Sequence, residues 1–496
     1  MASNLTRDVN GRILSNNSPI ILHGGHYYLF KDGDNPGRGL FKPNEPVPFA
    51  VQYTGVPCQT ETFTVQEMLW QPEPWTILFD HLNNMKCNLL RVWLTGGTLV
   101  SGTGGEPKPL DLTPFHLSNV NGHWKWDVYD AVINHNWNAE FFRRLAKFAE
   151  IAEGRGVNLQ ISLFNYLDLT RRFDGGDFRA WCRSFWNPAL CNNPPSLPNW
   201  GTNHLVNAGQ SFLCTDAPNN EYENARQSFF LVPTNGLRQV QQALVTKTVQ
   251  SLTGRTNIIY EVMNEPRGTH EQATAFSSTV VGWILRAAGA QRPLISINAS
   301  NYYADVAGQP PTFDIDWWRD HPAYANYDKV DAISYHGLTG YPASVQTVCN
   351  KGNQQVPPVD PGAIKTRFDT HTNKTSGKGH PTKSLIYSTD AARVGALLHT
   401  YKDQTGTITY ELHVRDGQIY TNYPNSNQDP WQTQRIRSDL QNWAYWCFSL
   451  AVKNPGVVHF QNHSMDQRAY RRLMDALNQA STSPMILAAA EQVETV

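Results

Sequence analysis

Residues 139–166, AEFFRRLAKFAEIAEGRGVNLQISLFNY, contain the unit from which we predict the fold. Their first half predicts an amphipathic helix over Ala139–Glu153, because apolar residues recur at helical spacing at Phe141, Phe142, Leu145, Phe148, Ala149 and Ala152. Gly154 and Gly156 favour the end of that helix. The apolar run that follows, Val157–Tyr166, is typical of a buried strand. A helix and a strand in this order indicate a parallel sheet with crossover helices.

The same alternation continues in both directions along the chain. The predicted strands are Pro19–Phe30, Cys87–Thr95, Val157–Tyr166, Asn257–Asn264, Leu294–Ala299, Val330–His336, Ser384–Asp390 and Gly456–Asn462. Further helices are expected at Leu237–Thr253, His270–Ala288, Ile436–Val452 and Met465–Ala480. Eight such repeats favour a closed barrel, because a barrel of about eight strands fills its own interior with side chains. We therefore predict an α/β fold, a (β/α)8 TIM barrel.

Long loops interrupt the barrel pattern at three places. We expect one barrel over residues 19–482, with an N-terminal extension at 1–18, a C-terminal tail at 483–496 and insertions at 97–138, 186–230 and 401–434. Each insertion follows a strand end, so the long loops should lie at the C-terminal face of the strands. The turn Asp416-Gly417 predicts a β-hairpin inside the third insertion. Loops of this length are usually functional in a compact domain.

The charge and composition restrict the kind of ligand. Lys and Arg number 41 and Asp and Glu number 42, so the formal net charge is -1 and we expect neither nucleic acid nor a membrane as partner. Aromatic residues make up 11% of the chain and include 15 Trp, which suits neutral sugars because their C–H faces stack on aromatic rings. The start of the sequence lacks the apolar core of a signal peptide, and we expect a cytoplasmic protein unless an export signal has been removed.

The cysteine spacing does not indicate a metal site. The seven cysteines, at positions 58, 87, 182, 191, 214, 349 and 447, form no Cys-x-x-Cys pair, and we expect no structural zinc and no cofactor. Cys182, Cys191 and Cys214 fall in one stretch with the composition of a loop. A disulfide bridge and buried thiols are both compatible with this stretch.

The end of the fourth strand provides the best candidate for a catalytic acid. In such barrels the reacting groups lie at the C-terminal ends of the strands. The segment Asn257-Ile-Ile-Tyr-Glu-Val-Met-Asn-Glu-Pro266 ends in an amide, a carboxylate and a strand-breaking proline. A lone Glu at a strand end is usually only solvated. Here the neighbouring Asn264 can donate to a sugar hydroxyl while Glu265 faces the leaving oxygen, so we predict that Glu265 is the acid.

The motif Asn264-Glu265-Pro266 after an apolar fourth strand resembles the signature of clan A glycoside hydrolases, in the neighbourhood of the family 5 cellulases and mannanases. The resemblance covers the barrel, because Pro19–Tyr28, Asn88–Trp93, Asn158–Asn165 and Asp331–His336 are similar to the first, second, third and sixth strands of that clan. It implies an enzyme that hydrolyses O-glycosidic bonds of an oligosaccharide or polysaccharide.

The resemblance also implies a role for each matched residue. Glu265 would be the general acid/base, and Asn264 would hold the hydroxyl next to the anomeric carbon. Arg91 would orient the nucleophilic carboxylate, although a structural ion pair inside the barrel is the alternative. Tyr335 or His336 would form a hydrogen bond near the nucleophile.

Four further residues complete the predicted site. Trp93 and Asn165, at the ends of the second and third strand segments, are candidates for substrate binding. The eighth strand, Val457–Asn462, lacks the Trp that is common in the clan, so Phe460 or the loop residue Trp431 would provide the sugar platform.

The seventh strand departs from the clan, because it ends in Asp390 where the clan has Glu. Glycoside hydrolysis requires two carboxyl groups, one to protonate the leaving oxygen and one on the opposite side of the sugar ring. We predict a retaining mechanism with Asp390 as the nucleophile. The alternative is an inverting mechanism in which Asp390 is the general base.

Two other readings compete with a glycosidase of this kind. A metal-dependent barrel hydrolase is suggested by His23, His26, His336 and His459, but residues three apart on a strand point to opposite faces, which separates His23 from His26. A carbohydrate-binding barrel without activity is suggested by the irregular seventh and eighth strands. In that reading Asp390 is structural.

Overall fold

The computed structural model describes the barrel and the elements around it. The described residues are 4–27, 46–50, 60–64, 79, 82–83, 87–94, 113–165, 185–186, 191–192, 229, 236–266, 269–299, 315–336, 361–373, 379–389, 413–415, 418–420 and 450–462. Asp390, Trp431 and the predicted helix Met465–Ala480 lie outside them.

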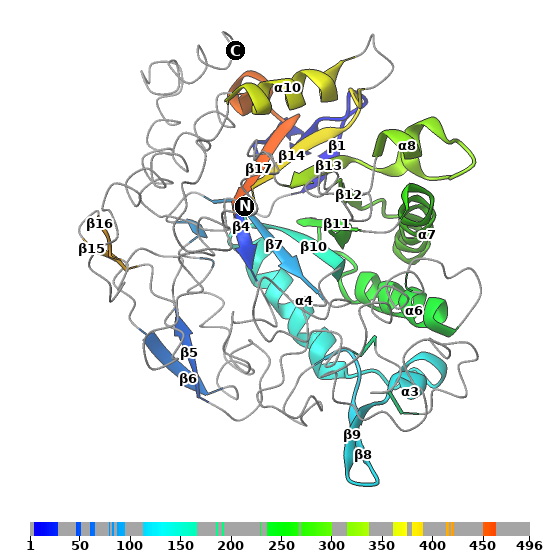
Figure 1. Ribbon diagram of the computed structural model, residues 1–496. Coiled ribbons are helices and arrows are strands. Elements are labelled where there is room, and N and C mark those ends of the chain that lie inside the picture. Colours follow the sequence, from blue (N-terminus) through cyan, green and yellow to red (C-terminus); the bar gives the residue numbers. More distant parts are fainter. Residues whose placement is uncertain are drawn as a thin grey trace, which may run out of the picture.

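Eight parallel strands close into a barrel (Figure 1). They neighbour one another in chain order, and the last strand closes the ring against the first. The strands are β4 (His23–Tyr27), β7 (Leu89–Trp93), β10 (Asn158–Asn165), β11 (Ile258–Asn264), β12 (Leu294–Asn298), β13 (Ala332–His336), β14 (Ser384–Thr389) and β17 (Val458–Asn462). Each of them lies within a predicted range, and the predicted (β/α)8 barrel is confirmed.

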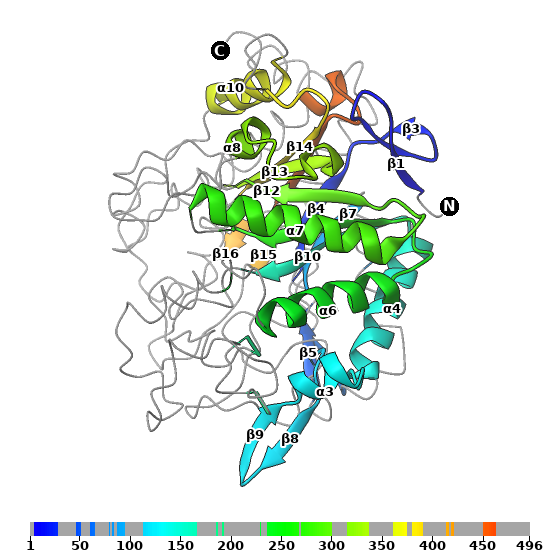
Figure 2. The same ribbon diagram turned by 90° about the vertical axis from the view of Figure 1, so that its right-hand side faces the viewer.

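Three long helices cover the outside of β10, β11 and β12 (Figure 2). They are α4 (Ala139–Gly154), α6 (Gly236–Ser251) and α7 (His270–Ala288), each within two residues of its predicted bounds. The shorter elements are α8 (Ile315–Asp320), η5 (Tyr327–Lys329) and α10 (Pro361–Thr372). Of the predicted helix Ile436–Val452 only the end from residue 450 is described, and it is helical. Every helix in the described ranges is too short or too polar to cross a lipid bilayer.

The start of α7 shows why the first residue of this helix could be predicted from the sequence. Thr269 accepts a hydrogen bond from the Gln272 backbone N–H at 3.2 Å, and the Gln272 side chain accepts one from the Thr269 N–H at 3.1 Å. This capping box satisfies two backbone donors that have no partner within the helix. Gly289, with φ of 62°, follows the last residue of the helix.

An apolar layer fills the N-terminal end of the barrel interior. It is formed by the first inward residues of the strands together with two residues of the N-terminal segment, and its buried members are Leu5, Ile13, Leu22, Leu89, Ile259, Leu294, Ala332 and Ile386. A second, larger cluster lies between the strands and the helices. Strand residues of the first cluster face the barrel interior, and alternate residues at the starts of the strands belong to the second.

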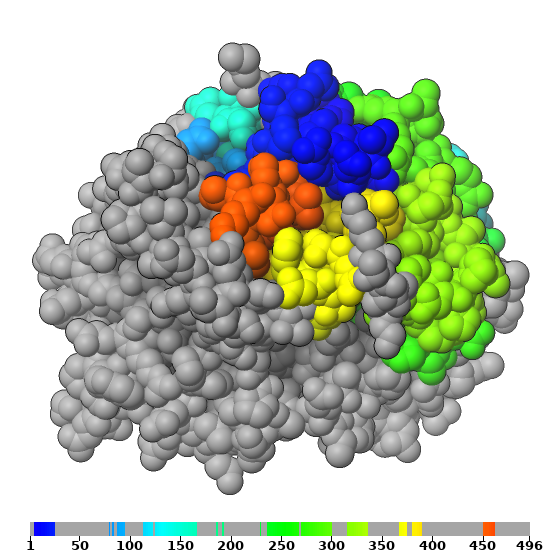
Figure 3. Space-filling view, turned by 90° about the horizontal axis from the view of Figure 1, so that it is seen from above, coloured from blue at the N-terminus to red at the C-terminus, as the bar shows by residue number. Residues whose placement is uncertain are grey.

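The N-terminal segment forms a three-stranded antiparallel sheet, β1 (Leu5–Arg7), β2 (Ile13–Ser15) and β3 (Ser18–Pro19). It lies against the part of the chain that contains β14 and β17 (Figure 3), and the Ser384 hydroxyl donates to the Gly11 carbonyl at 2.9 Å. The predicted first strand began too early, because Pro19 pairs with Leu14 in this sheet and the barrel strand begins at His23.

The predicted loop 97–138 is wrong for its described part. Residues 113–138 contain a hairpin, β8 (Leu117–Val120) with β9 (His123–Trp126), and the helix α3 (Val128–Ile133). Asn121 and Gly122 link the strands with φ of 54° and 86°, which is the two-residue turn that Asn-Gly favours. The hairpin projects from the molecule (Figure 2).

Two further hairpins belong to the described structure. β15 (His413–Arg415) and β16 (Gln418–Tyr420) pair antiparallel on either side of Asp416-Gly417, so the predicted hairpin is confirmed. β5 (Pro46–Ala50) and β6 (Thr60–Thr64) form another antiparallel pair that the sequence pattern did not predict.

Candidate active site

Glu265 lies directly beyond the end of β11, at the C-terminal mouth of the barrel. Its backbone has φ of 48°, a region that residues other than glycine rarely adopt. Pro266 follows and cannot donate a hydrogen bond to a neighbouring strand. The side chain of Glu265 is partly exposed, whereas Asn264 before it is buried. The chain therefore turns sharply at the carboxylate, as is frequent at functional sites.

An ion pair lies deeper in the barrel than Glu265. The side chains of Arg91 on β7 and Glu261 on β11 are both fully buried, and the Arg91 Nε and Nη2 atoms donate to Glu261 Oε2 at 2.8 and 2.5 Å. Burying two charges is costly unless they are paired and their remaining hydrogen-bonding groups are satisfied. The Arg91 Nη2 atom also donates to Asn264 Oδ1 at 2.8 Å.

This contact fixes the orientation of the Asn264 amide. A guanidinium group carries only donors, so the Asn264 atom that faces Arg91 must be the oxygen. The nitrogen Nδ2 then lies on the other side of the amide and donates to Asn165 Oδ1 at 3.0 Å. The predicted residues Arg91, Asn264 and Asn165 thus form one hydrogen-bonded chain, and its middle residue, Asn264, directly precedes Glu265.

The other oxygen of Glu261 belongs to a wider polar layer. Gln160 on β10 donates to Glu261 Oε1 at 3.3 Å and to the Ser296 hydroxyl on β12 at 3.0 Å. Gln461 on β17 donates to the side-chain oxygen of Gln160. The layer therefore joins β7, β10, β11, β12 and β17 directly above the apolar layer.

The sequence analysis did not select Glu261, although a signal for it was present. Barrel strands place every second residue inward. Three members of the polar layer come two positions after a member of the apolar layer: Arg91 after Leu89, Glu261 after Ile259, and Ser296 after Leu294. A charged residue at such a position needs a partner inside the barrel, and Arg91 and Glu261 are the two in the described strands that face each other this way.

Strict alternation does not explain why Asn264 also contacts Arg91, because residues 261 and 264 would point to opposite faces. The register of β10 with β11 pairs Ser162 with Glu261 and next Phe164 with Met263, and so skips Leu163 and Val262. Phe164 and Met263 belong to the outer cluster. Beyond this gap the register is unchanged and pairs Asn165 with Asn264, which lie together at the mouth.

The family model described as Cellulase (glycosyl hydrolase family 5) matches residues 47–483. The chain belongs to glycosyl hydrolase family 5. None of the curated proteins matches it significantly. It is a glycoside hydrolase with a carbohydrate as substrate.

Three of the solved structures similar to this family 5 chain are enzymes from a fungus and a mussel. A variant of the family 5 mannosidase from Rhizomucor miehei is 11% identical, with 99% of each chain covered and a TM-score of 0.49. The endo-1,4-β-mannanase from the same organism is 10% identical, with 96% of this chain and 100% of that chain covered and a TM-score of 0.43. The β-mannanase from the blue mussel Mytilus edulis is 9% identical, with coverages of 98% and 99% and a TM-score of 0.42.

The described contacts of Tyr335 lie on the outer side of the family 5 barrel. Tyr335 belongs to the outer cluster, the Arg367 guanidinium lies 4.6 Å from the centre of its ring, and its ring meets that of His371 edge-on. Ala332, three residues earlier on β13, belongs to the inner layer. The parity of that inner face continues through Ser334 to His336, whose side chain lies outside the described residues. A role beside the nucleophile remains a prediction, and the parity favours His336.

Trp93 is buried on β7, two positions beyond Arg91 and so on the parity of the inward face. The predicted nucleophile Asp390 follows directly after β14 and lies outside the described residues, as does Trp431. On β14, Ile386 belongs to the inner layer, and Ser388 and Asp390 have the same parity along the sequence.

The histidines that suggested a metal centre are buried and neutral where they are described. Desolvation lowers the pKa of His23 to about 4, and the ring of His23 stacks on Phe460. Burial lowers the pKa of His459 to about 3, and its Nδ1 accepts the Leu22 backbone N–H at 3.0 Å. Within the described ranges, no group of three or more His, Cys, Asp or Glu residues is placed to hold a metal ion.

The described cysteines are thiols. Cys87 and Cys191 are buried thiols outside any disulfide, and burial raises the pKa of both. Cys191 is therefore not bridged to Cys182 or Cys214, which lie outside the described residues.

Proposed function

We propose that this family 5 glycoside hydrolase cleaves O-glycosidic bonds of an oligosaccharide or polysaccharide by a retaining double displacement, with Glu265 as acid/base and Asp390 as nucleophile. The observation that carries the proposal is the fixed amide of Asn264 next to Glu265. Its oxygen is held by Arg91, and one of its two N–H groups is directed to Asn165. The second N–H is the donor that we assign to the hydroxyl next to the anomeric carbon.

The reaction then proceeds in two steps. In the first, the Asp390 carboxylate bonds to the anomeric carbon while the bond to the leaving oxygen breaks and Glu265 protonates that oxygen. In the second, Glu265 takes a proton from water, the water oxygen bonds to the anomeric carbon, and the bond to Asp390 breaks. The hydrogen bond from Asn264 strengthens as positive charge develops on the ring, which lowers the barrier of both steps.

The shorter side chain at position 390 bears on the stereochemistry. Retention requires carboxyl groups about 5–5.5 Å apart, whereas inversion requires roughly 6.5–9.5 Å to admit a water molecule. Replacing Glu by Asp withdraws the carboxylate by about 1.5 Å if the backbone keeps its position. Retention is supported by membership of family 5. It is also supported by the hydrogen-bonded residues Arg91 and Asn264, because such residues suit a mechanism with a nucleophile and a covalent intermediate better than one with an attacking water. Inversion with Asp390 as general base is the alternative.

The first test is hydrolysis of a panel of glucan, mannan, galactan and xylan oligosaccharides by the wild-type protein and by Glu265→Gln. The amide cannot donate the catalytic proton, so we expect Glu265→Gln to lower turnover of unactivated substrates by about 100-fold or more. Aryl glycosides with activated leaving groups should be affected less in the first step. Near wild-type turnover of a natural substrate by Glu265→Gln would refute the acid assignment.

The second test is proton NMR of the product as it first forms. An initial anomer with the configuration of the substrate supports Asp390 as nucleophile. The opposite anomer would make Asp390 a general base.

A further inference from the structure

Glu261 is a buried charged residue that the proposed reaction does not use. Its side chain is fully buried in the barrel interior, on the strand that ends in Asn264. Its described partners are side chains of the protein, with Arg91 on one oxygen and Gln160 on the other. A carboxylate in this position acts on the substrate only through its neighbours.

The first of these effects is geometric. A single nitrogen of Arg91, Nη2, donates both to Glu261 Oε2 at 2.5 Å and to Asn264 Oδ1 at 2.8 Å. Because Nε of Arg91 also bonds to the same Glu261 oxygen, Glu261 fixes the plane of the guanidinium. Any displacement of the Glu261 carboxylate therefore moves the donor that orients the Asn264 amide.

The second effect is electrostatic. Arg91 and Glu261 together carry no net charge, so the pair adds little to the potential at the barrel mouth. Removing the charge of Glu261 takes one negative charge out of a region of low dielectric beside Arg91. Carboxyl groups at the mouth would then ionise at lower pH.

We propose that Glu261 is a positioning residue for the glycosidase reaction, holding Arg91 so that Asn264 presents its N–H to the sugar and cancelling the Arg91 charge at the mouth. The inference rests on the proposed roles of Asn264 and Glu265.

Few groups near Glu261 in the described part of the barrel are charged, so a shift of the pH profile in a Glu261 variant can be attributed to the lost carboxylate charge. On the adjacent strands β10 and β12 the side chains of its polar layer are Gln160 and Ser296, and on β17 it is Gln461. His459, two residues before Gln461, is buried and neutral. Arg91 on β7 is the charged group bonded to Glu261 in the described part of the barrel. Glu265 is the other acidic residue of β11 and its end.

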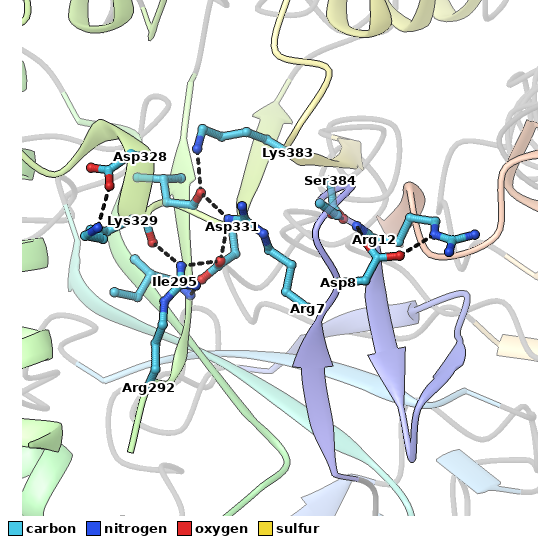
Figure 4. A network of polar contacts seen from close by, with 12 residues as sticks. Arg7, Asp8, Arg12, Arg292, Ile295, Asp328, Lys329, Asp331, Lys383 and Ser384 are labelled. Atoms are coloured by element: carbon cyan, nitrogen blue, oxygen red, sulfur yellow. Dashed lines mark hydrogen bonds and ion pairs between the residues drawn. The ribbon is translucent and has the colours of Figure 1, made fainter. Parts of the chain in front are cut away.

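A matched control exists at the opposite end of the barrel (Figure 4). Asp331 is also a fully buried carboxylate, and one of its oxygens pairs with Arg7 at 2.8 Å and with Arg292 at 2.7 Å. Its second oxygen accepts the Ile295 backbone N–H at 2.9 Å. Asp331→Asn therefore removes the charge of a buried ion pair far along the strands from the reacting groups.

The experiment compares kcat, KM and the pH dependence of kcat/KM for Glu261→Gln and Asp331→Asn. For Glu261→Gln we expect kcat to fall on the order of 10- to 100-fold with a smaller change in KM, because the Asn264 contact matters most in the transition state. Both limbs of its pH profile should move to lower pH by about half a unit or more. Asp331→Asn should lose thermal stability but keep the wild-type kcat and pH profile. A wild-type kcat and pH profile in folded Glu261→Gln would overturn the inference.

Glu261→Asp separates the geometric effect from the electrostatic effect. It also provides the test if Glu261→Gln does not fold. It keeps the charge but shortens the side chain, so we expect a lowered kcat with the pH profile of the wild type. An undiminished kcat in folded Glu261→Asp would refute the geometric role.

A measurement that does not depend on catalytic turnover distinguishes this inference from the proposed function. With ¹⁵N-labelled asparagine, the side-chain amide signal of Asn264 should shift in both Glu261 variants and stay in place in Asp331→Asn. An unshifted signal in both Glu261 variants overturns the positioning role, whatever the activity. Failure of the proposed function shows separately, as an inactive wild-type protein or an unimpaired Glu265→Gln.

Discussion

At the scale of single residues, Arg91 makes the buried ion pair that the sequence analysis gave as the alternative to a role beside the nucleophile, and it also contacts Asn264. The structural alternative was an ion pair inside the barrel, and Arg91 does pair with the buried Glu261. The same guanidinium also holds Asn264, the neighbour of the proposed acid. A residue that is both part of the core and part of the site cannot be classified from composition or spacing alone, because the partner that decides it comes from a strand 170 positions away.

Replacing Arg91 by Lys tests this double role. An ammonium group is a point charge and cannot reproduce the planar arrangement of Nε and Nη2, so it cannot hold Glu261 and Asn264 together. We expect Arg91→Lys to lower the free energy of unfolding by about 1–3 kcal/mol, and kcat/KM to fall by about 10-fold or more. Urea denaturation and steady-state kinetics measure the two effects. A loss of stability with normal kcat/KM would make Arg91 a structural residue alone.

At the scale of elements, the predictable parts are those in which local pattern and tertiary packing agree. The helix α7 has a capping box, an apolar face and a terminal glycine, and its predicted bounds were correct. The β8–β9 hairpin was missed although Asn121-Gly122 is a strong turn signal, because the long insertion was interpreted only as a loop. The contact of Asn264 with Arg91 could not be predicted, since residues 261 and 264 would point to opposite faces of a regularly alternating strand.

The N-terminal sheet supplies a prediction about stability at one end of the barrel. Ile13 is fully buried in the apolar layer that fills this end, so Ile13→Ala should lower the free energy of unfolding by about 2–5 kcal/mol. Ile133→Ala is the matched control, because Ile133 is 44% exposed and its truncation should change stability by less than about 0.5 kcal/mol. Both variants should keep the wild-type kcat/KM. An equal effect of the two changes on the denaturation midpoint would mean that the N-terminal sheet does not seal the barrel.

At the scale of the whole molecule, the barrel separates function from stability along its axis. The apolar layer and the Asp331 network lie at the N-terminal ends of the strands, and the polar layer with Arg91 and Glu261 lies between them and the mouth. This order explains why the fold could be predicted from the sequence while the role of Asp390 at the end of the seventh strand stays a prediction. The strands close the barrel through residues at their starts, whereas the chemistry depends on residues at their ends.

Buried histidines distributed over this structure should set the acid limit of its stability. Desolvation lowers the pKa of His23 to about 4 and of His371 and His459 to about 3, from an ordinary value of 6.5. The folded state keeps these rings neutral while the unfolded chain binds protons below pH about 6.5. Their contribution to stability is therefore complete above that pH and is lost as the pH falls toward the folded-state values.

Each such histidine adds a slope of up to about 1.4 kcal/mol per pH unit to the free energy of unfolding between roughly pH 6 and pH 4. We expect urea denaturation at a series of pH values to show the free energy of unfolding falling steeply across this window, before most carboxylates are protonated.

Replacing His371 by Gln tests the contribution of one buried ring, whose Nε2 bonds to the Lys383 carbonyl at 2.8 Å. His371→Gln should reduce the slope of the free energy of unfolding against pH by the amount that one titrating histidine contributes. A slope that is the same in the wild type and in His371→Gln would show that this ring is already protonated in the folded protein.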